Sequence, residues 1–312
     1  MYLQHFALLE APFSITPDAA FFYPHEGAQA ALNTLLVALR SGEGFLKIVG
    51  EVGCGKTVLC RQLLHTLHGE CVTAYVPNPD LGPRDLLLAL AGELGLQLPA
   101  SATRYRLLCS LQACLLGHAA QGRSVVLVVD EAQAIPVRTV ESLRLLSNLE
   151  TEKRKLIQIV LLGQPELDRK LARPEIRQLL QRITFSEHLG PMAAERVGPY
   201  LRHRLQVAAA GQAGDPDLFD PQAVHALANF SGGVPRVVNV LANKCLMLAY
   251  GENRRRVTAA DVRLAAKDTG GVDTSETSWW DRLVGGRFRA AGAHAGAALP
   301  ASRAGGPPKV RP

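Results

Sequence analysis

Residues 44–67 read GFLKIVGEVGCGKTVLCRQLLHTL, and they fall into three parts with different patterns. The first part is a short apolar run of the kind found in buried strands. The second, GEVGCGKT at 50–57, matches the phosphate-loop pattern GxxxxGK followed by Ser or Thr. The third has helical apolar spacing, so the loop lies between a predicted strand and a predicted helix. This is the context in which the pattern forms a phosphate-binding loop.

The chemistry of phosphate binding explains each part of the pattern. Glycines allow backbone N–H groups to turn toward an anion, and the following helix adds the positive end of its dipole. Lys56 would reach the β- and γ-phosphates, and the Thr57 hydroxyl would be a ligand of Mg²⁺. Cys54 is unusual in such a loop: either it fills space, or it is a thiol that oxidants can reach. The predicted nucleotide-binding residues here are Gly50, Glu51, Val52, Gly53, Cys54, Gly55, Lys56, Thr57 and Val58.

A second polar site follows the apolar run at 125–129, in the segment VVLVVDEAQ. Asp130 and Glu131 would end this strand at the carboxyl edge of a parallel sheet, where ligands bind in doubly wound folds. There Asp130 would hold Mg²⁺, and Glu131 would act as general base on the attacking water. The alternative is an acidic helix N-terminus exposed to solvent. The apolar run directly before the pair favours the site.

Two further polar residues fit the same centre. Gln164 follows the apolar segment LIQIVLLG and would orient the water near the γ-phosphate; alternatively it is a polar cap before Pro165. Arg236 lies in the first turn of a helix predicted to begin within GGVPRVV. A cation at that place opposes the helix dipole, so local structure does not favour it. A nucleotide phosphate as partner would explain its position.

Strand and helix patterns alternate through the first part of the chain, which predicts an α/β domain over residues 1–190 with three layers and a parallel sheet. Continuous apolar runs are expected where both faces of such a sheet are covered. The predicted strands are 44–50, 71–76, 124–130, 156–163 and 182–189. The predicted helices are 57–68, 83–95, 104–120, 137–152 and 165–181.

After residue 190 the strand patterns stop. Helical spacing in four segments, separated by turn residues, predicts a small all-helical domain over 191–269. These segments are 193–210, 221–230, 234–250 and 258–268. Residues 270–312 are dominated by Gly, Ala, Pro, Ser and Arg, so we expect a disordered basic tail. Trp279 and Trp280 in it are either a short amphipathic anchor or part of the disorder.

Composition and charge exclude several classes of protein. With 47% hydrophobic and 20% charged residues, the chain of 312 residues is not globally disordered. Half of the net charge of +6 comes from 270–312, so the predicted folded part is nearly balanced and a nucleic-acid partner is not favoured. The six cysteines contain no CxxC pair, as in a reducing compartment. No apolar run approaches the length of a membrane span, and we expect a cytoplasmic protein.

Together these motifs resemble the AAA+ ATPases. More narrowly, they resemble the branch of general secretion pathway protein A and the MSHA-type pilus biogenesis ATPases, most of all the latter, which are similarly short. The resemblance spans about residues 1–268. It rests on FALLEAPFSITPDAAFFYP, GEVGCGKT, VVLVVDEAQ, LRLLSNLETEKRKLIQIVLLGQPEL, LLQRI and GGVPRVVN. The opening segment and the NLETEKRK to GQPEL stretch are the most specific to this branch.

The resemblance implies ATP and Mg²⁺ as ligands, and it implies roles for several residues. Gln164 takes the place of the sensor-1 residue, and Arg236 that of the sensor-2 arginine in a helical lid domain. Arg182, in LLQRI, matches the arginine finger that one subunit supplies to the next. Arg173 and Arg177 are competing candidates for that role. A finger that works between subunits implies a homo-oligomer, such as a ring.

The function that this resemblance implies is ATP hydrolysis in the assembly of a type IV pilus or type II secretion apparatus. The partners would be assembly proteins at the inner membrane, with the ATPase cytoplasmic or peripheral to that membrane. The PFSITPD segment near the start would pack by the adenine. One alternative is a DNA-associated AAA+ ATPase, such as a transposition helper or initiator. Another is a scaffold that binds ATP with little turnover, which Glu131 and Arg182 argue against.

Overall fold

The computed structural model describes residues 2–151, 154–211 and 214–270. Five strands form a parallel sheet in the order β2-β3-β4-β1-β5. They are β1 (Phe45–Gly50), β2 (Cys71–Val76), β3 (Ser124–Val129), β4 (Ile157–Gly163) and β5 (Ile183–Leu189). β1 and β4 are buried at every residue, which explains their almost continuous apolar sequence. All five strands therefore end at one edge of the sheet, where the loops after β1, β3 and β4 meet.

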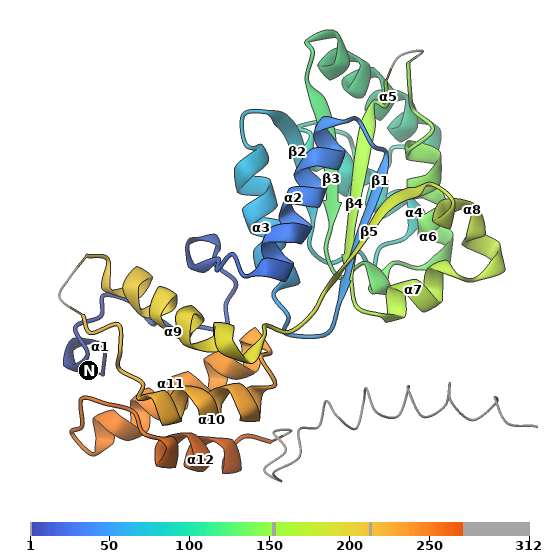
Figure 1. The fold of residues 1–312 in the computed structure, drawn as a ribbon. Helices are drawn as coiled ribbons and strands as arrows, with labels where there is room; N and C mark the ends of the chain where they lie inside the picture. The colour runs from blue at the N-terminus through green and yellow to red at the C-terminus, as the bar shows by residue number, and fades with distance from the viewer. Residues whose placement is uncertain (1, 152–153, 212–213, 271–312) are drawn as a thin grey trace, which may run out of the picture.

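Helices cover both faces of this sheet, so the predicted three-layer α/β fold is confirmed (Figure 1). One apolar core lies under α2 (Glu26–Arg40) and α3 (Lys56–Leu67). A second core lies on the opposite face, beneath five helices. These are α4 (Pro83–Glu93), α5 (Arg104–Ala120), α6 (Val137–Leu146), α7 (Glu166–Leu171) and α8 (Arg177–Leu180).

Three helical elements differ from the sequence prediction. The helix α2 was not predicted, although its apolar residues recur with helical spacing. The predicted helix 165–181 is broken into α7, a 3-10 turn at Pro174–Ile176 and α8. Pro174 explains the break, because it lacks an N–H donor and disfavours helical geometry in the residue before it. The predicted helix 137–152 ends earlier, at Leu146.

The second part of the molecule is helical, as predicted, and contains α9 (Ala194–Ala209), α10 (Pro221–Ser231), α11 (Pro235–Gly251) and α12 (Ala259–Lys267). Local signals in the sequence explain two helix starts. The Asp220 carboxylate accepts from the N–H of Ala223, with proline at the first helical position of α10. Thr258 and Asp261 form a capping box at the start of α12.

The start of the chain packs against the helical part. It contains α1 (Tyr2–His5) and a 3-10 turn at Ala19–Phe21. Phe6, Leu8, Phe13 and Phe21 lie in the same apolar core as residues of α9, α10, α11 and α12. The division expected from the sequence groups residues 1–190 together, whereas this core joins Phe6, Leu8, Phe13 and Phe21 to the helical part.

Within the described residues, none of the helices combines the length and the apolar character needed to cross a bilayer. The structure describes no residue after 270. The predicted tail from residue 271 onward, with Trp279 and Trp280, therefore lies outside the described residues. The structure therefore tests the predictions for the sheet and for the helical part, but not those for the tail.

Candidate nucleotide site

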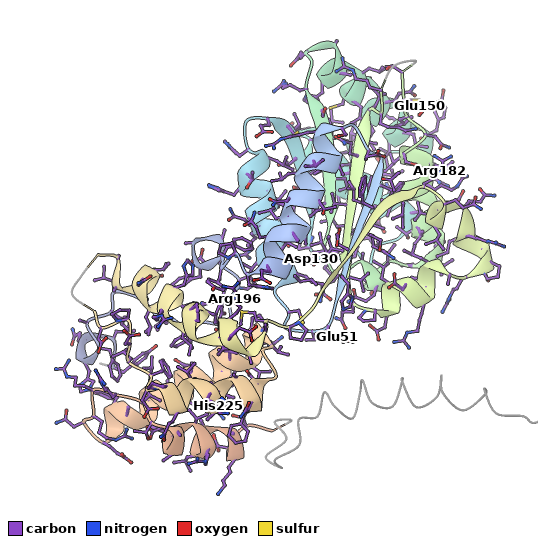
Figure 2. All side chains as sticks on the ribbon, in the orientation of Figure 1. Glu51, Asp130, Glu150, Arg182, Arg196 and His225 are labelled. Atoms are coloured by element: carbon purple, nitrogen blue, oxygen red, sulfur yellow. The ribbon has the colours of Figure 1, made fainter. Side chains whose placement is uncertain are left out.

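The residues predicted to bind nucleotide gather where the carboxyl edge of the sheet faces the helical part. Figure 2 shows Glu51 at this end of the sheet and Arg182 toward the opposite end. A pocket here is lined by residues from four regions of the chain: the opening segment, the phosphate loop, the ends of β3 and β4, and helices α9 and α11. Its predicted members are Val52, Gly53, Gly55, Lys56, Thr57, Val58, Glu131, Gln164 and Arg236.

Glycine is required in the loop for conformational and for spatial reasons. Gly53 and Gly55 have φ values of +86° and +94°, a region that residues with a side chain rarely adopt. Gly50 has a different role. A Cβ atom on it would lie 2.4 Å from the backbone oxygen of Leu189, so β5 could not pass so close to the loop. The glycines of the pattern are therefore needed for two reasons: Gly53 and Gly55 allow the loop to curve, and Gly50 allows β5 to lie close to it.

The Lys56 ammonium lies on the inner side of the loop. Its Nζ donates hydrogen bonds to the backbone oxygens of Gly50 at 2.8 Å and Glu51 at 3.0 Å. Burial lowers the pKa of Lys56, and the Glu131 carboxylate opposes this shift most strongly. The loop thus holds a buried cation next to the first turn of α3, whose N-terminus also favours anions.

Asp130 and Thr57 provide the oxygen atoms that a hard cation prefers. Asp130 is buried and accepts the N–H of Glu131 at 2.9 Å, and the nearby Thr57 side chain acts to lower its pKa. Burial raises the pKa of Asp130. No group of three or more His, Cys, Asp or Glu side chains that could hold a metal occurs among the described residues. A Mg²⁺ ion, which keeps water and phosphate ligands, fits a hydroxyl and one carboxylate.

The Glu131 carboxylate is held by two amide side chains. Its Oε2 accepts hydrogen bonds from Nε2 of Gln133 at 2.5 Å and from Nε2 of Gln164 at 3.1 Å. The backbone of Glu131 is in the left-handed region, with φ of +49°. Gln164, predicted from its place after β4, thus contacts the predicted base. Gln133 stands in the segment VVLVVDEAQ, but no pattern in the sequence indicates a role for it.

The helical part contacts the phosphate loop through α11. The N–H of Arg236 donates to the backbone oxygen of Gly53 at 3.2 Å. A Cβ atom on Gly53 would lie 2.8 Å from Cβ of Arg236, so the contact depends on that glycine. Arg236 thus lies beside the loop, as its predicted role in phosphate binding requires.

The opening segment forms the opposite wall of the pocket, where Ser14, Ile15, Thr16, Pro17 and Asp18 contribute. Arg204 of α9 holds this segment, since its buried guanidinium donates to the backbone oxygens of Pro12 and Ser14. Two neighbours of Arg204 in the pocket, Tyr200 and Asn239, share a hydrogen bond of 2.8 Å. The resemblance predicts that this segment packs by the adenine, whereas no sequence motif marks Arg204, Tyr200 or Asn239.

The arginine-finger candidates lie away from the phosphate loop of their own chain. Arg182 immediately precedes β5, at the amino-terminal edge of the sheet, and is half-buried; its Nη1 donates to the Ser147 hydroxyl at 3.3 Å. Arg173 and Arg177 are exposed and flank the 3-10 turn between α7 and α8. The structure of one chain thus brings none of them to its own site, and the role of each stays a prediction.

Cys54 is almost completely buried, at 1% exposure. Burial raises the pKa of its thiol to about 11, so the reactive thiolate is rare at neutral pH. The structure therefore favours the space-filling interpretation over a thiol that oxidants reach.

Comparisons with known proteins agree with this fold. Residues 39–171 match the family model described as AAA domain. Over 284 residues, 91% of this chain, the sequence is 41% identical to general secretion pathway protein A of Aeromonas hydrophila. This match covers 51% of the relative, so the chain spans about half of that protein's length.

Solved structures of three proteins share the fold. The ORC2 protein of Aeropyrum pernix has a TM-score of 0.62 at 19% identity, over 84% of this chain and 74% of that one. Cdc6p of Pyrobaculum aerophilum has a TM-score of 0.66 at 18% identity, over 84% and 72%. The RuvB Holliday junction branch migration motor of Thermotoga maritima has a TM-score of 0.54 at 17% identity, over 83% and 74%. At these identities the likeness shows the fold alone.

The sheet order, the phosphate loop after β1 and the helical part beside it define a AAA+ P-loop nucleotide-binding protein. The predicted resemblance to the AAA+ ATPases and to general secretion pathway protein A is confirmed, whereas the closer resemblance to the MSHA-type pilus ATPases stays a prediction. The chain contains a AAA domain at residues 39–171, and over most of its length it is similar to general secretion pathway protein A.

Proposed function

We propose that this protein binds Mg-ATP and hydrolyses it to ADP and phosphate. The observation that carries the proposal is the convergence of Lys56, Thr57, Glu131, Gln164 and Arg236 on one pocket, from elements far apart in the sequence. This set contains a phosphate ligand, a metal ligand, a base, a polar residue beside the base and a second cation. Phosphoryl transfer requires these parts, because its catalysis depends mainly on positioning and electrostatic stabilisation.

Each residue then has a role that its surroundings support. Lys56 and Arg236 would stabilise negative charge on the phosphates, and Thr57 and Asp130 would hold Mg²⁺. A bound Mg²⁺ would neutralise charge on the phosphate oxygens. Glu131 would accept a proton from the attacking water. The opening segment, held by Arg204, would cover the adenine and the ribose of the nucleotide.

Replacement of the loop lysine tests this assignment. Lys56→Ala should abolish binding of a fluorescent ATP analogue while the far-ultraviolet circular dichroism stays unchanged, because the cation that contacts the phosphates is lost. Lys267→Ala is the matched control, since Lys267 is exposed at the end of α12 and distant in sequence from the loop. Unchanged ATP affinity in Lys56→Ala would contradict the proposal.

For the cellular role, we propose assistance in assembling a type II secretion apparatus or a type IV pilus of the MSHA type, at the inner membrane. The 41% identity to general secretion pathway protein A supports a secretion-related role. A host strain that lacks the gene should lose secretion or pili, and it should regain them with the wild-type gene but not with Lys56→Ala. Normal secretion and pili in that strain, together with ATP turnover that DNA stimulates, would favour the DNA-associated alternative.

A further inference from the structure

The carboxylate of Glu131 is anchored through only one of its two oxygens. Both amide donors, from Gln133 and Gln164, bind Oε2. Among the described residues, Oε1 has no hydrogen-bond partner. Hydrogen bonds to a carboxylate oxygen stabilise its negative charge and fix its direction. The arrangement therefore leaves Oε1 as the oxygen that is available to accept a proton.

The side chain of Gln133 forms hydrogen bonds with both Glu131 and Gln164. Its Nε2 donates to Glu131, and its Oε1 accepts the backbone N–H of Gln164 at 3.0 Å. It lies in the 3-10 turn Ala132–Ala134 directly after β3, whereas Gln164 directly follows β4. One side chain thus links the ends of two neighbouring strands. Gly163 leaves room for it, since a Cβ there would lie 3.1 Å from Oε1 of Gln133.

The nearby lysine shows why such an anchor is needed. Of the surrounding charges, Glu131 acts most strongly on Lys56, yet no ion pair joins these two side chains in the part of the chain that the structure describes. Lys56 instead donates to two backbone oxygens. A carboxylate free to turn would be attracted to this ammonium, and the pairing would occupy the base and the phosphate ligand together.

We propose that Gln133 is a positioning residue for the catalytic base: its amide fixes Oε2 of Glu131, keeps the carboxylate off Lys56 and leaves Oε1 free to take a proton from water. This inference rests on the proposed ATP hydrolysis, in which Glu131 is the base. It predicts a loss of turnover without a loss of ATP binding, because Gln133 acts on Glu131 and not on the phosphates.

Two replacements distinguish the effect of the Gln133 Nε2 donor, which binds Glu131, from that of its Oε1 acceptor, which binds the N–H of Gln164. Gln133→Met keeps the length of the side chain and removes both hydrogen bonds. Gln133→Glu keeps an oxygen for the N–H of Gln164 but sets a second carboxylate against Glu131. We expect kcat to fall by about 100-fold in both variants at pH 8, the scale of effect caused by a misplaced catalytic group. KM and the affinity for a fluorescent ATP analogue should stay near the wild-type values. Gln112→Met, on the exposed side of α5, is the matched control.

The pH dependence distinguishes positioning from a merely structural role. At pH 6 the two carboxyl groups of the Gln133→Glu variant can share a proton, and the shared proton replaces the lost N–H donor. The deficit in kcat relative to wild type should therefore shrink between pH 8 and pH 6 for Gln133→Glu, but not for Gln133→Met. The charged groups near the two carboxyl groups are unchanged in both variants: Lys56 and Asp130, which act on Glu131, and Lys170 of α7, whose Nζ donates to the backbone oxygens of Gln133 and Ile135.

The outcomes are distinct. Wild-type kcat in Gln133→Glu at both pH values, with only Gln133→Met impaired, would mean that Gln133 merely supports the backbone of Gln164, and it would overturn the proposal. Wild-type kcat in both variants would overturn it as well. These results leave the proposed function intact if Glu131→Gln is inactive. Absence of ATP turnover in the unmodified chain would instead overturn the proposed function, and with it the role of Gln133.

Discussion

At the scale of single residues, the fold holds Asp130, the carboxylate proposed to bind Mg²⁺, at some cost in stability. The residue is 2% exposed, and burial raises the pKa of its carboxyl group above the ordinary value of 3.8. A carboxyl group with a raised pKa binds its proton more tightly in the folded than in the unfolded state. The resulting stability is complete below pH 3.8 and is lost as the pH rises through the folded-state pKa. At neutral pH the charged Asp130 therefore destabilises the fold.

Asp130→Asn should relieve this cost. We expect a higher Tm than wild type at pH 7 in the absence of nucleotide, and a difference that shrinks as the pH falls toward 4. The same variant should lose Mg²⁺-dependent ATP turnover by at least about 100-fold, since a catalytic metal ion contributes several kcal/mol. Thermal unfolding at both pH values, with an ATPase assay at pH 7, checks both parts. A lower Tm at pH 7 would show that the Asp130 charge is favourable in the fold.

The sequence predicts residues of this site where the chemistry requires a local pattern. Lys56 and Thr57 are defined by spacing within one loop, and Asp130 and Glu131 by an apolar run directly before them. Gln133 and Arg204 have no such local signal. Arg204 binds the backbone of Pro12, 192 positions away, and this contact exists only after the opening segment packs on α9.

At the scale of elements, the strands are predicted more closely than the helices. The segment 71–76 is observed with the same ends, although β2 lies at the edge of the sheet and only its residues Ala74 and Val76 are buried. The helix α2 shows that helical spacing can be overlooked when no motif marks it: its N-cap, His25, makes no side-chain cap. The break at Pro174 could have been predicted, since proline ends helices through its own chemistry.

The connection into the helical part depends on Gly233, in the turn between α10 and α11. Its φ is +73°, and a Cβ there would lie 1.9 Å from the backbone oxygen of Met192. Gly233→Ala should therefore destabilise the protein by more than about 1 kcal/mol, whereas Gly92→Ala in α4, where a Cβ meets nothing within 4 Å, should stabilise it slightly. Urea unfolding measures both. Equal stability of Gly233→Ala and wild type would mean that this turn rearranges without cost.

At the scale of the whole molecule, one chain brings together the proposed ligands, the proposed base and the polar neighbour of that base. Among the described residues, it brings none of the candidate arginine fingers into its own pocket. The three candidate arginines lie close together in the sequence: Arg173 directly before the 3-10 turn Pro174–Ile176, Arg177 at the start of α8, and Arg182 directly before β5. An arginine that acts in trans must reach a neighbouring subunit, so this geometry is compatible with the proposed ring. Arg182 remains the candidate by resemblance, with the other two as competitors.

Mixing variants tests the ring. Replacing the true finger with Ala should reduce turnover by about 100-fold, the scale for losing one stabilising donor. Adding Lys56→Ala protein should restore part of it, because that subunit still donates its finger to an intact neighbouring site. Each of Arg173→Ala, Arg177→Ala and Arg182→Ala is mixed separately, and specific activity is followed against protein concentration. Activity that is independent of concentration, with no rescue in any mixture, would contradict an oligomeric active site.

The central claim is that Glu131 activates water at a Mg-ATP site, and a single-turnover experiment on Glu131→Gln tests it most directly. Radiolabelled ATP is bound to excess protein, Mg²⁺ is added, and phosphate release is followed with time. We expect wild-type binding of ATP but release at least about 100-fold slower than wild type, since the variant keeps an oxygen for Gln133 and Gln164 and loses the base. Phosphate release by Glu131→Gln at the wild-type rate would contradict the account.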